Sequence, residues 1–224
     1  MQWRAILCGS GLENAKMEHN LTNVEARVLG ALIEKDLTTP EYYPLSLNAL
    51  VNACNQKSSR DPVVAYDDST VEDAIESLRH KGFAKVITGA GSRVAKYGHR
   101  LSETLNLGRR ELPLLCVLML RGFQTLGELR ARTERMYEFS DTDEVDRVLQ
   151  SMDQLVTKLP HLPGTKEARY AHLMSGPVEV DAAGGVAAAQ TPHRGDRMAA
   201  LEQDIAELRR EIETIKEKLG DLLG

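Results

Sequence analysis

The sequence predicts a mainly α fold with small β-hairpins, which places it in the α+β class. Three observations lead to that prediction. Apolar residues recur at helical spacing in several short stretches, and most of these stretches begin with a helix-capping residue. Two strand-like stretches around a glycine-rich turn follow the first group of helices. Aromatic residues make up only 4% of the chain, which is typical of small helical modules with aliphatic cores.

Three helices are predicted in the first part of the chain. The first covers residues 21–36 and opens with Thr22 and Glu25, a capping box in which each side chain bonds the other residue's backbone. The second covers residues 46–57, after a break caused by two prolines. Each has apolar residues three and four positions apart, so each is expected to bury one face.

The third helix and a hairpin complete this first unit. Ser69 with Glu72 is predicted to form a second capping box, and Gly82 ends the helix. Strands are predicted over residues 83–87 and 93–101, separated by a turn whose glycines suit positive φ angles. Three helices followed by a two-stranded hairpin is the order of a winged helix, a helix-turn-helix variant.

The same order of elements returns later in the chain. Helices are predicted over residues 111–122, 125–134 and 141–156, and a strand-like segment closes the second unit. The pattern Ala-[Lys/Arg]-Tyr-x-His occurs at Ala95–His99 and again at Ala168–His172, 73 residues further on. The repeat indicates a duplication and therefore two tandem winged-helix domains. Chance similarity of two helical units is the alternative.

The last part of the chain has a different composition. Residues 176–195 are rich in Gly, Ala and Pro and predict a flexible linker. Residues 196–224 carry apolar residues at alternating intervals of three and four, which predicts a parallel two-stranded coiled coil and so a homodimer. One amphipathic helix folding back onto its own domain is the alternative. The predicted dimerisation residues are Met198, Leu201, Ile205, Leu208, Ile212, Ile215, Leu219 and Leu222.

These features divide the chain into five predicted parts. Residues 1–16 show no pattern and are expected to be a disordered leader, which makes Met17 a candidate start. The parts after the leader are a first winged-helix domain at 17–105, a second at 106–175, the linker at 176–195 and the coiled-coil helix at 196–224.

Charge and motifs narrow the class of function. The net charge is -5, of which residues 176–224 supply -4, so the two domains are near neutral and lack the basic excess typical of nucleic-acid binders. The six histidines and three cysteines show no metal-ligand spacing, and no nucleotide or hydrolase motif occurs. We therefore expect no cofactor, no metal and no enzymatic activity. Well-separated cysteines and the lack of a long apolar run favour a cytoplasmic protein without a membrane span.

Three stretches resemble a known family: "LTNVEARVLGALIEKDLTTPEYYPLSLNALVNACNQKSSRDPV", "LRGFQTLGELRART" and "RMYEFSD". They are similar to the YceH-like family of uncharacterised bacterial proteins, over residues 21 to about 175. The resemblance implies a tandem winged-helix fold. It brings no established activity, so function has to be argued from the residues.

The helices expected to enter a DNA groove open with acids. In a helix-turn-helix the first residues of the third helix meet base edges. Here the first such helix opens with Asp67, Asp68, Glu72 and Asp73, and the second offers Asp141, Asp143, Glu144 and Asp146. Acids favour helix starts through capping and the helix dipole, but they repel phosphates.

DNA contacts are therefore predicted on the wings and loops rather than on the third helices. The leading hypothesis is DNA association in transcriptional regulation by a dimer. Solvated surface charge is the alternative for each basic residue. The predicted DNA-binding residues are Lys57, Arg60, Lys85, Arg93, Lys96, Arg130, Arg132 and Arg135.

A protein-interaction scaffold that does not bind nucleic acid is the rival hypothesis. The acidic third helices favour it. A loop that holds Met136, Tyr137 and Phe139 also favours it, since exposed aromatic residues suit a protein interface. The alternative for this loop is that Tyr137 and Phe139 tuck under the second unit.

Overall fold

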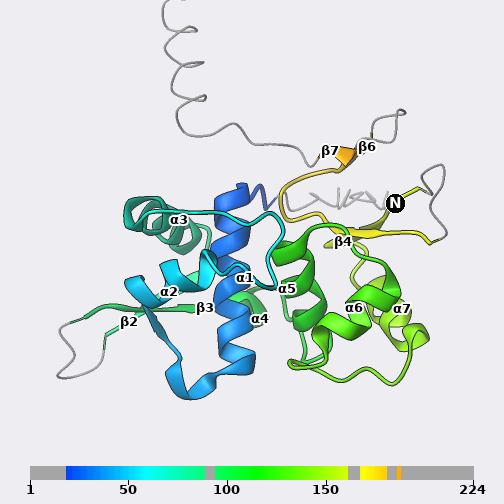
Figure 1. Ribbon diagram of the computed structural model, residues 1–224, viewed down its shortest axis with the longest axis horizontal. Helices are drawn as coiled ribbons and strands as arrows, with labels where there is room; N and C mark the ends of the chain where they lie inside the picture. The colour runs from blue at the N-terminus through cyan, green and yellow to red at the C-terminus, as the bar shows by residue number, and fades with distance from the viewer. Residues whose placement is uncertain (1–18, 89–93, 161–166, 181–185, 188–224) are drawn as a thin grey trace, which may run out of the picture. The chain divides into compact units, whose positions relative to one another are not determined.

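The computed structural model describes residues 19–88, 94–160, 167–180 and 186–187, and these form an α+β protein as predicted. Within these ranges there are seven α-helices, one short 3-10 helix and small antiparallel sheets (Figure 1). The predicted leader, the coiled-coil helix with its eight dimerisation residues, and Arg93 lie outside the described residues.

Three helices form the first repeat: α1 (Asn23–Thr38), α2 (Leu47–Cys54) and α3 (Asp68–His80). The predicted capping box is confirmed, since Thr22 accepts from the backbone N–H of Glu25 at 3.1 Å and returns its own N–H to that carboxylate at 2.6 Å. The cap predicted for α3 is wrong. Asp67, not Ser69, accepts from the N–H of Thr70 at 2.8 Å, and α3 starts at Asp68.

A three-stranded antiparallel sheet completes this repeat. It contains β1 (Leu45–Ser46), β2 (Ala84–Ile87) and β3 (Lys96–His99), in the order β1–β3–β2. The hairpin register pairs Ala84 with His99. On the other edge of β3, Leu45 of β1 pairs with Tyr97. Strand β1 and the 3-10 helix η1 (Pro40–Tyr42) before it have no sequence signal, because each is only two or three residues long.

The second repeat is shorter and follows α4 (Leu101–Thr104). It contains α5 (Glu111–Arg121), α6 (Leu126–Thr133) and α7 (Thr142–Ser151), then β4 (Val156–Lys158) paired with β5 (Tyr170–His172). Thr125 and Glu128 form a capping box at the start of α6, as Thr22 and Glu25 do for α1. Two further short strands, β6 (Glu179–Val180) and β7 (Val186–Ala187), pair within the segment predicted to be linker.

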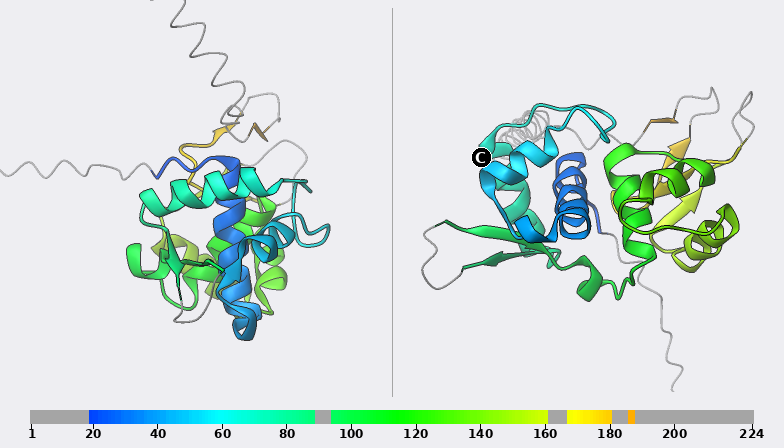
Figure 2. Two further views of the ribbon diagram at one scale, coloured as in Figure 1. Left: turned by 90° about the vertical axis from the view of Figure 1, so that its left-hand side faces the viewer. Right: turned by 60° about the horizontal axis from the view of Figure 1, so that its bottom comes forward.

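The two repeats share one hydrophobic core, because α1 of the first packs along α5 of the second (Figures 1 and 2). Both helices are buried around most of their circumference in their middle turns. Gly30 of α1 lies against Leu120 of α5. A Cβ on this residue would lie 2.9 Å from Cγ of Leu120, so only glycine lets the helices come this near.

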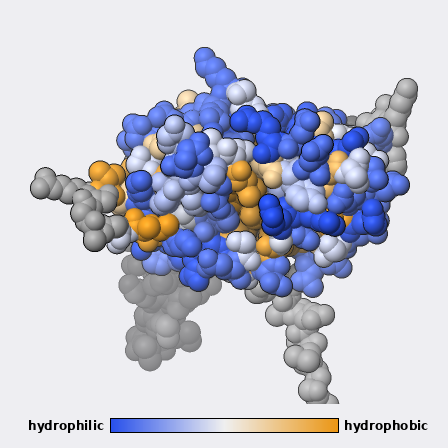
Figure 3. All heavy atoms as spheres, turned by 90° about the horizontal axis from the view of Figure 1, so that it is seen from below, coloured by the Kyte–Doolittle hydropathy of each residue, from blue (hydrophilic) through white to orange (hydrophobic). Residues whose placement is uncertain are grey.

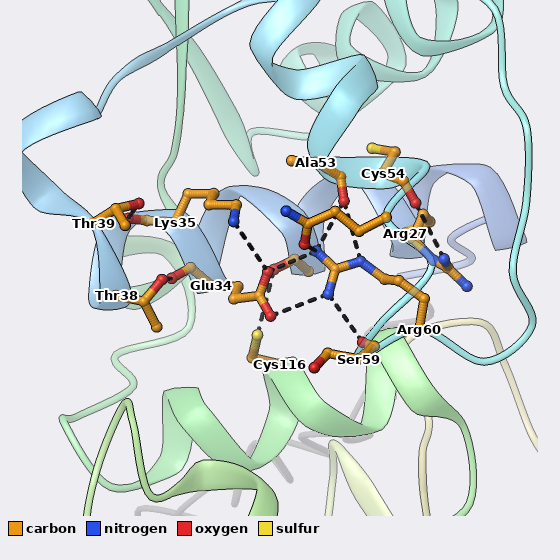
Figure 4. Close-up of polar contacts among 12 residues, drawn as sticks. Arg27, Glu34, Lys35, Thr38, Thr39, Ala53, Cys54, Ser59, Arg60 and Cys116 are labelled. Carbon is orange, nitrogen blue, oxygen red and sulfur yellow. Dashed lines mark hydrogen bonds and ion pairs between the residues drawn. The ribbon is translucent and has the colours of Figure 1, made fainter.

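A buried arginine network fixes the loop between α2 and α3 at this junction (Figure 4). The guanidinium of Arg60 donates to both carboxylate oxygens of Glu34 on α1, at 3.0 and 2.6 Å, and to the carbonyl of Ala53 at the end of α2. Arg27 of α1 donates to the carbonyl of Cys54 at 3.3 Å. Two cations thus cap the negative end of α2, where the last carbonyls lack partners within the helix.

The same loop is attached to α5 through the backbone. The N–H of Asp61 donates to the carbonyl of Leu120 at 2.9 Å. The loop therefore joins α1, α2 and α5 at one point. Arg60 is its buried anchor, while Lys57, Ser58 and Ser59 before it are exposed.

Replacing Arg60 by Met should lower the free energy of unfolding by about 3–5 kcal/mol, because it leaves the largely buried Glu34 carboxylate with only the Lys35 ammonium, 3.9 Å away, as a partner. Urea denaturation of the full chain measures this loss. Replacing both Arg60 and Glu34 by Met should cost less than Arg60→Met alone, since no unpaired charge remains. Arg79→Met is the matched control, because its ion pair with Glu76 is about half exposed and should contribute less than about 1 kcal/mol. Equal losses for Arg60→Met and Arg79→Met would contradict the role given to the network.

Candidate interaction surface

The N-terminal end of α3 presents acidic side chains to solvent. Asp67, Asp68 and Glu72 are all exposed. Hydrogen bonds from Thr70 hold the pKa of Asp67 below its usual range, so this cap is ionised at neutral pH. Among the described residues, no Lys, Arg or His forms an ion pair with Asp68 or Glu72.

The N-terminal end of α7 is also acidic, but a nearby arginine partly neutralises its charge. Asp141 caps the helix by accepting the N–H of Glu144 at 2.7 Å, and that bond lowers the pKa of Asp141. Asp143 is exposed. Glu144 accepts from Ser140 and lies 3.5 Å from the guanidinium of Arg110. The two third helices therefore share an acidic N-terminal end, and that of α3 carries less compensating charge.

The basic residues predicted to contact DNA differ in how far their charges are available to a partner. Arg60 is a correction, because its side chain is fully buried in the network above and cannot reach a phosphate. Lys85 forms an ion pair with Glu103, and Arg132 forms one with Glu128, each at 3.3 Å. The four that remain exposed in the described part of the chain are Lys57, Lys96, Arg130 and Arg135.

Arg121 at the end of α5 is a basic residue that the sequence reasoning missed. Burial lowers its pKa most, followed by the positive charges of Arg132 and Arg60. Arg121 is half-buried, so its charge is only partly available to a partner.

The aromatic loop is folded against the second repeat. Phe139 is only 2% exposed, so its prediction as a partner-binding residue is wrong and the alternative holds. The ring of Tyr137 lies 4.7 Å from that of Phe139 and is half-buried beneath the guanidinium of Arg110. Met136 is also half-buried and packs against the core. In Figure 3 the face seen from below is mostly hydrophilic, with small separate hydrophobic patches.

The two repeated histidines have different surroundings. Nε2 of His99 lies 3.0 Å from the Asp36 carboxylate, and its Nδ1 accepts the N–H of Leu101 at 3.3 Å. Within the described residues Nδ1 of His172 has no hydrogen-bond partner, and burial lowers the pKa of His172 to about 4. It lines a cavity of about 100 Å³ together with Phe123 and Ser175.

The remaining reactive groups are inert by burial. Cys54 and Cys116 are free thiols, and burial raises the pKa of Cys54 to about 12 and that of Cys116 further still. Cys116 donates to the carbonyl of Gly30 at 3.3 Å. In the described ranges, no group of three or more His, Cys, Asp and Glu residues could hold a metal ion. No helix in those ranges is long and apolar enough to cross a membrane.

The elements and charges define an α+β protein built from a repeated helical unit with acidic third-helix ends. The chain belongs to the family described as "Protein of unknown function, DUF480", whose profile matches residues 21–165. A UPF0502 protein of Solibacter usitatus is 52% identical over 206 residues, covering 89% of this chain and 98% of its own length. A UPF0502 protein of Pelobacter propionicus is 49% identical over 217 residues, covering 93% and 99%. The predicted membership in an uncharacterised bacterial family is thus confirmed.

Replacing Phe139 by Ala should lower the free energy of unfolding by about 3–5 kcal/mol, because it removes a buried ring and leaves a cavity. Tyr137→Ala, which alters the half-buried neighbouring ring, should cost only about 1 kcal/mol. Urea denaturation of both variants tests the difference. If Phe139→Ala is as stable as the parent, the ring is not part of the core and is again a candidate for binding a partner.

Stability should fall as the pH is lowered through the range in which His172 titrates. Its pKa is about 4 in the folded chain and about 6.5 when unfolded, so between these values only the unfolded chain binds the proton. The contribution is complete above about pH 6.5 and is lost toward pH 4, by at most about 3 kcal/mol. His172→Phe should flatten this part of the stability profile measured by urea denaturation, while the exposed control His80→Phe should not. Identical slopes for the two variants would contradict the shift.

Proposed function

We propose that this chain is a tandem winged-helix protein that acts as a protein-interaction module through its third helices. The order α1–α2–α3 followed by β2–β3, repeated as α5–α6–α7 followed by β4–β5, supports the winged-helix assignment. The observation that carries the functional proposal is the exposed acidic end of α3, where Asp68 and Glu72 have no cationic partner among the described residues. A partner with a basic surface is the complement.

Electrostatics disfavour the usual winged-helix docking on DNA. That mode places the first residues of the third helix against the base edges, between two rows of phosphates. A carboxylate 4 Å from a phosphate is repelled by about 1 kcal/mol even at the dielectric constant of water. The same carboxylates attract lysine and arginine side chains of a protein partner, which gives both association rate and specificity.

The distribution of the basic residues agrees with this proposal. A DNA-binding protein gains most of its affinity from cations that neutralise phosphates. Here Arg60 is buried, and Lys85 and Arg132 already interact with carboxylates of the same chain. Lys85 or Arg132 could neutralise a phosphate only by breaking its existing ion pair.

DNA association remains the second candidate, and the exposed Lys96 at the start of β3 favours it. A wing that carries a cation reaches phosphates or the minor groove without bringing the third helix close. Lys57, Arg130 and Arg135 are the other exposed cations available for such a mode. Under either candidate the C-terminal heptad helix is proposed to make a homodimer, which would present each surface twice. We assign the protein no enzymatic activity or cofactor.

Fluorescence anisotropy with two labelled probes, a lysine-rich peptide and a mixed-sequence DNA duplex, separates the two candidates. Measurements at several salt concentrations should show peptide binding that weakens with salt and no DNA binding. Asp68→Asn with Glu72→Gln should weaken peptide binding about tenfold. Asp67 is left intact, since it caps α3.

The control is Glu134→Gln on the exposed side of the second repeat, which should leave peptide binding unchanged. The opposite outcome is DNA binding whose logarithm falls linearly with the logarithm of salt concentration. If that binding survives Asp68→Asn with Glu72→Gln and is lost in Lys96→Ala with Arg130→Ala, the wing-led DNA mode replaces the interaction module.

A further inference from the structure

The connection between α2 and α3 contains a short segment, residues 62–66, that is held at both ends. At its start, the guanidinium of Arg27 on α1 donates to the carbonyl of Pro62 at 2.6 Å. At its end, the side chain of Asn55 bonds both backbone groups of Tyr66: Nδ2 donates to the carbonyl at 2.7 Å, and Oδ1 accepts the N–H at 2.8 Å. The connection lies at the periphery of the molecule in both views of Figure 2. The segment is thus fixed at the surface.

The two hydrogen bonds to Asn55 indicate which way the backbone of this segment faces. A residue whose N–H and C=O bond the same partner is extended, as in a hydrogen-bonded pair of antiparallel strands. Successive residues of an extended chain direct their backbone groups to opposite sides. Those of Val63 and Ala65 therefore face away from Asn55. The side chains alternate too, since Val63 and Ala65 are exposed whereas Val64 and Tyr66 are half-buried.

The backbone groups that face away from Asn55 are open to a partner. In the described part of the chain, no hydrogen bond involves the N–H or the C=O of Val63 or Ala65. The side chain of Val63 is also 57% exposed, which is unusual for a large apolar residue in this protein. An extended segment with unpaired N–H and C=O groups is a strand edge that lacks its neighbour. Such an edge can accept an extended peptide as an additional strand, held by main-chain hydrogen bonds.

The charges next to this edge indicate which side chains the peptide carries. Asp67 and Asp68 follow Ala65 within three residues, and both are exposed. A strand that pairs with Val63 and Ala65 and continues in the same line passes the acidic end of α3. Lysine or arginine side chains on that strand meet opposite charge there, which favours both association and the correct register.

We propose that Val63 and Ala65 form a docking edge for an extended, lysine- or arginine-containing peptide segment of a partner protein. The peptide pairs its backbone with these two residues, an apolar side chain packs on Val63, and a basic side chain reaches Asp68. This inference rests on the function proposed above and specifies how the basic partner binds: as an added β-strand rather than as a helix or a folded surface.

The first test is amide hydrogen exchange of the full chain, measured by NMR with and without the lysine-rich peptide. Binding should slow exchange at least tenfold at the amides of Val63 and Ala65, because their N–H groups become donors to the peptide. The amide of Val64 faces the side of Asn55 and should change less than twofold. The same peptide with every backbone amide methylated keeps its charges but has no N–H donors, so it should bind at least tenfold more weakly.

Two proline variants provide a matched pair. Ala65→Pro removes one N–H of the docking edge and should weaken peptide binding about tenfold. Val64→Pro removes an N–H that faces the other side, and it should leave the affinity within about twofold of the parent. If either variant does not fold, the exchange experiment and the methylated peptide still decide, since both use the unaltered chain.

The outcomes distinguish this inference from the function on which it rests. Peptide binding that is weakened by Asp68→Asn with Glu72→Gln, without slower exchange at Val63 and Ala65, would mean that the acids attract basic side chains without an added strand. That result, or equal affinity for the methylated and unmethylated peptides, overturns the docking edge and leaves the proposed function in place. No binding of either peptide at low salt overturns both.

Discussion

The guanidinium of Arg60 is the interaction on which the junction of the molecule depends. A fully buried cation must find a carboxylate and further acceptors, and it finds Glu34 on α1 and the carbonyl of Ala53 on α2. The requirement fixes three things at once: the path of the loop after α2, the distance between α1 and α2, and the capping of the α2 carbonyls. Arg27 completes that capping from the other side. The loop so placed then bonds α5 through Asp61.

The shared core follows from this junction. Two tandem domains joined by a flexible connection would each have a separate core. Here α1 of the first repeat and α5 of the second lie in one core, and a Cβ on Gly30 of α1 would collide with Leu120 of α5. A substitution at this crossing, such as Gly30→Leu, would therefore disturb the surfaces of both repeats, although it touches neither.

Interactions between residues close in sequence could be predicted, whereas contacts between residues far apart in sequence could not. The boxes at Thr22 and Thr125 were recognisable because both partners lie within four residues. Asp67 and Ser69 are equally good capping residues, so sequence alone could not choose the start of α3. Arg60 read as a surface cation because its partner Glu34 is 26 residues away. Phe139 was predicted to be exposed because no local pattern in its loop indicates that its ring is buried.

Capping explains only part of the acidity of the third helices. One carboxylate is enough to cap a helix, and Asp67 and Asp141 do so. The favourable effect of the helix dipole falls off within the first turn, which covers Asp68 but not Glu72. Glu72 lies in the second turn, exposed and without an ion pair in the described part of the chain. Helix stability does not require a charge at Glu72, and under the proposed function this additional carboxylate is the group that a basic partner would bind.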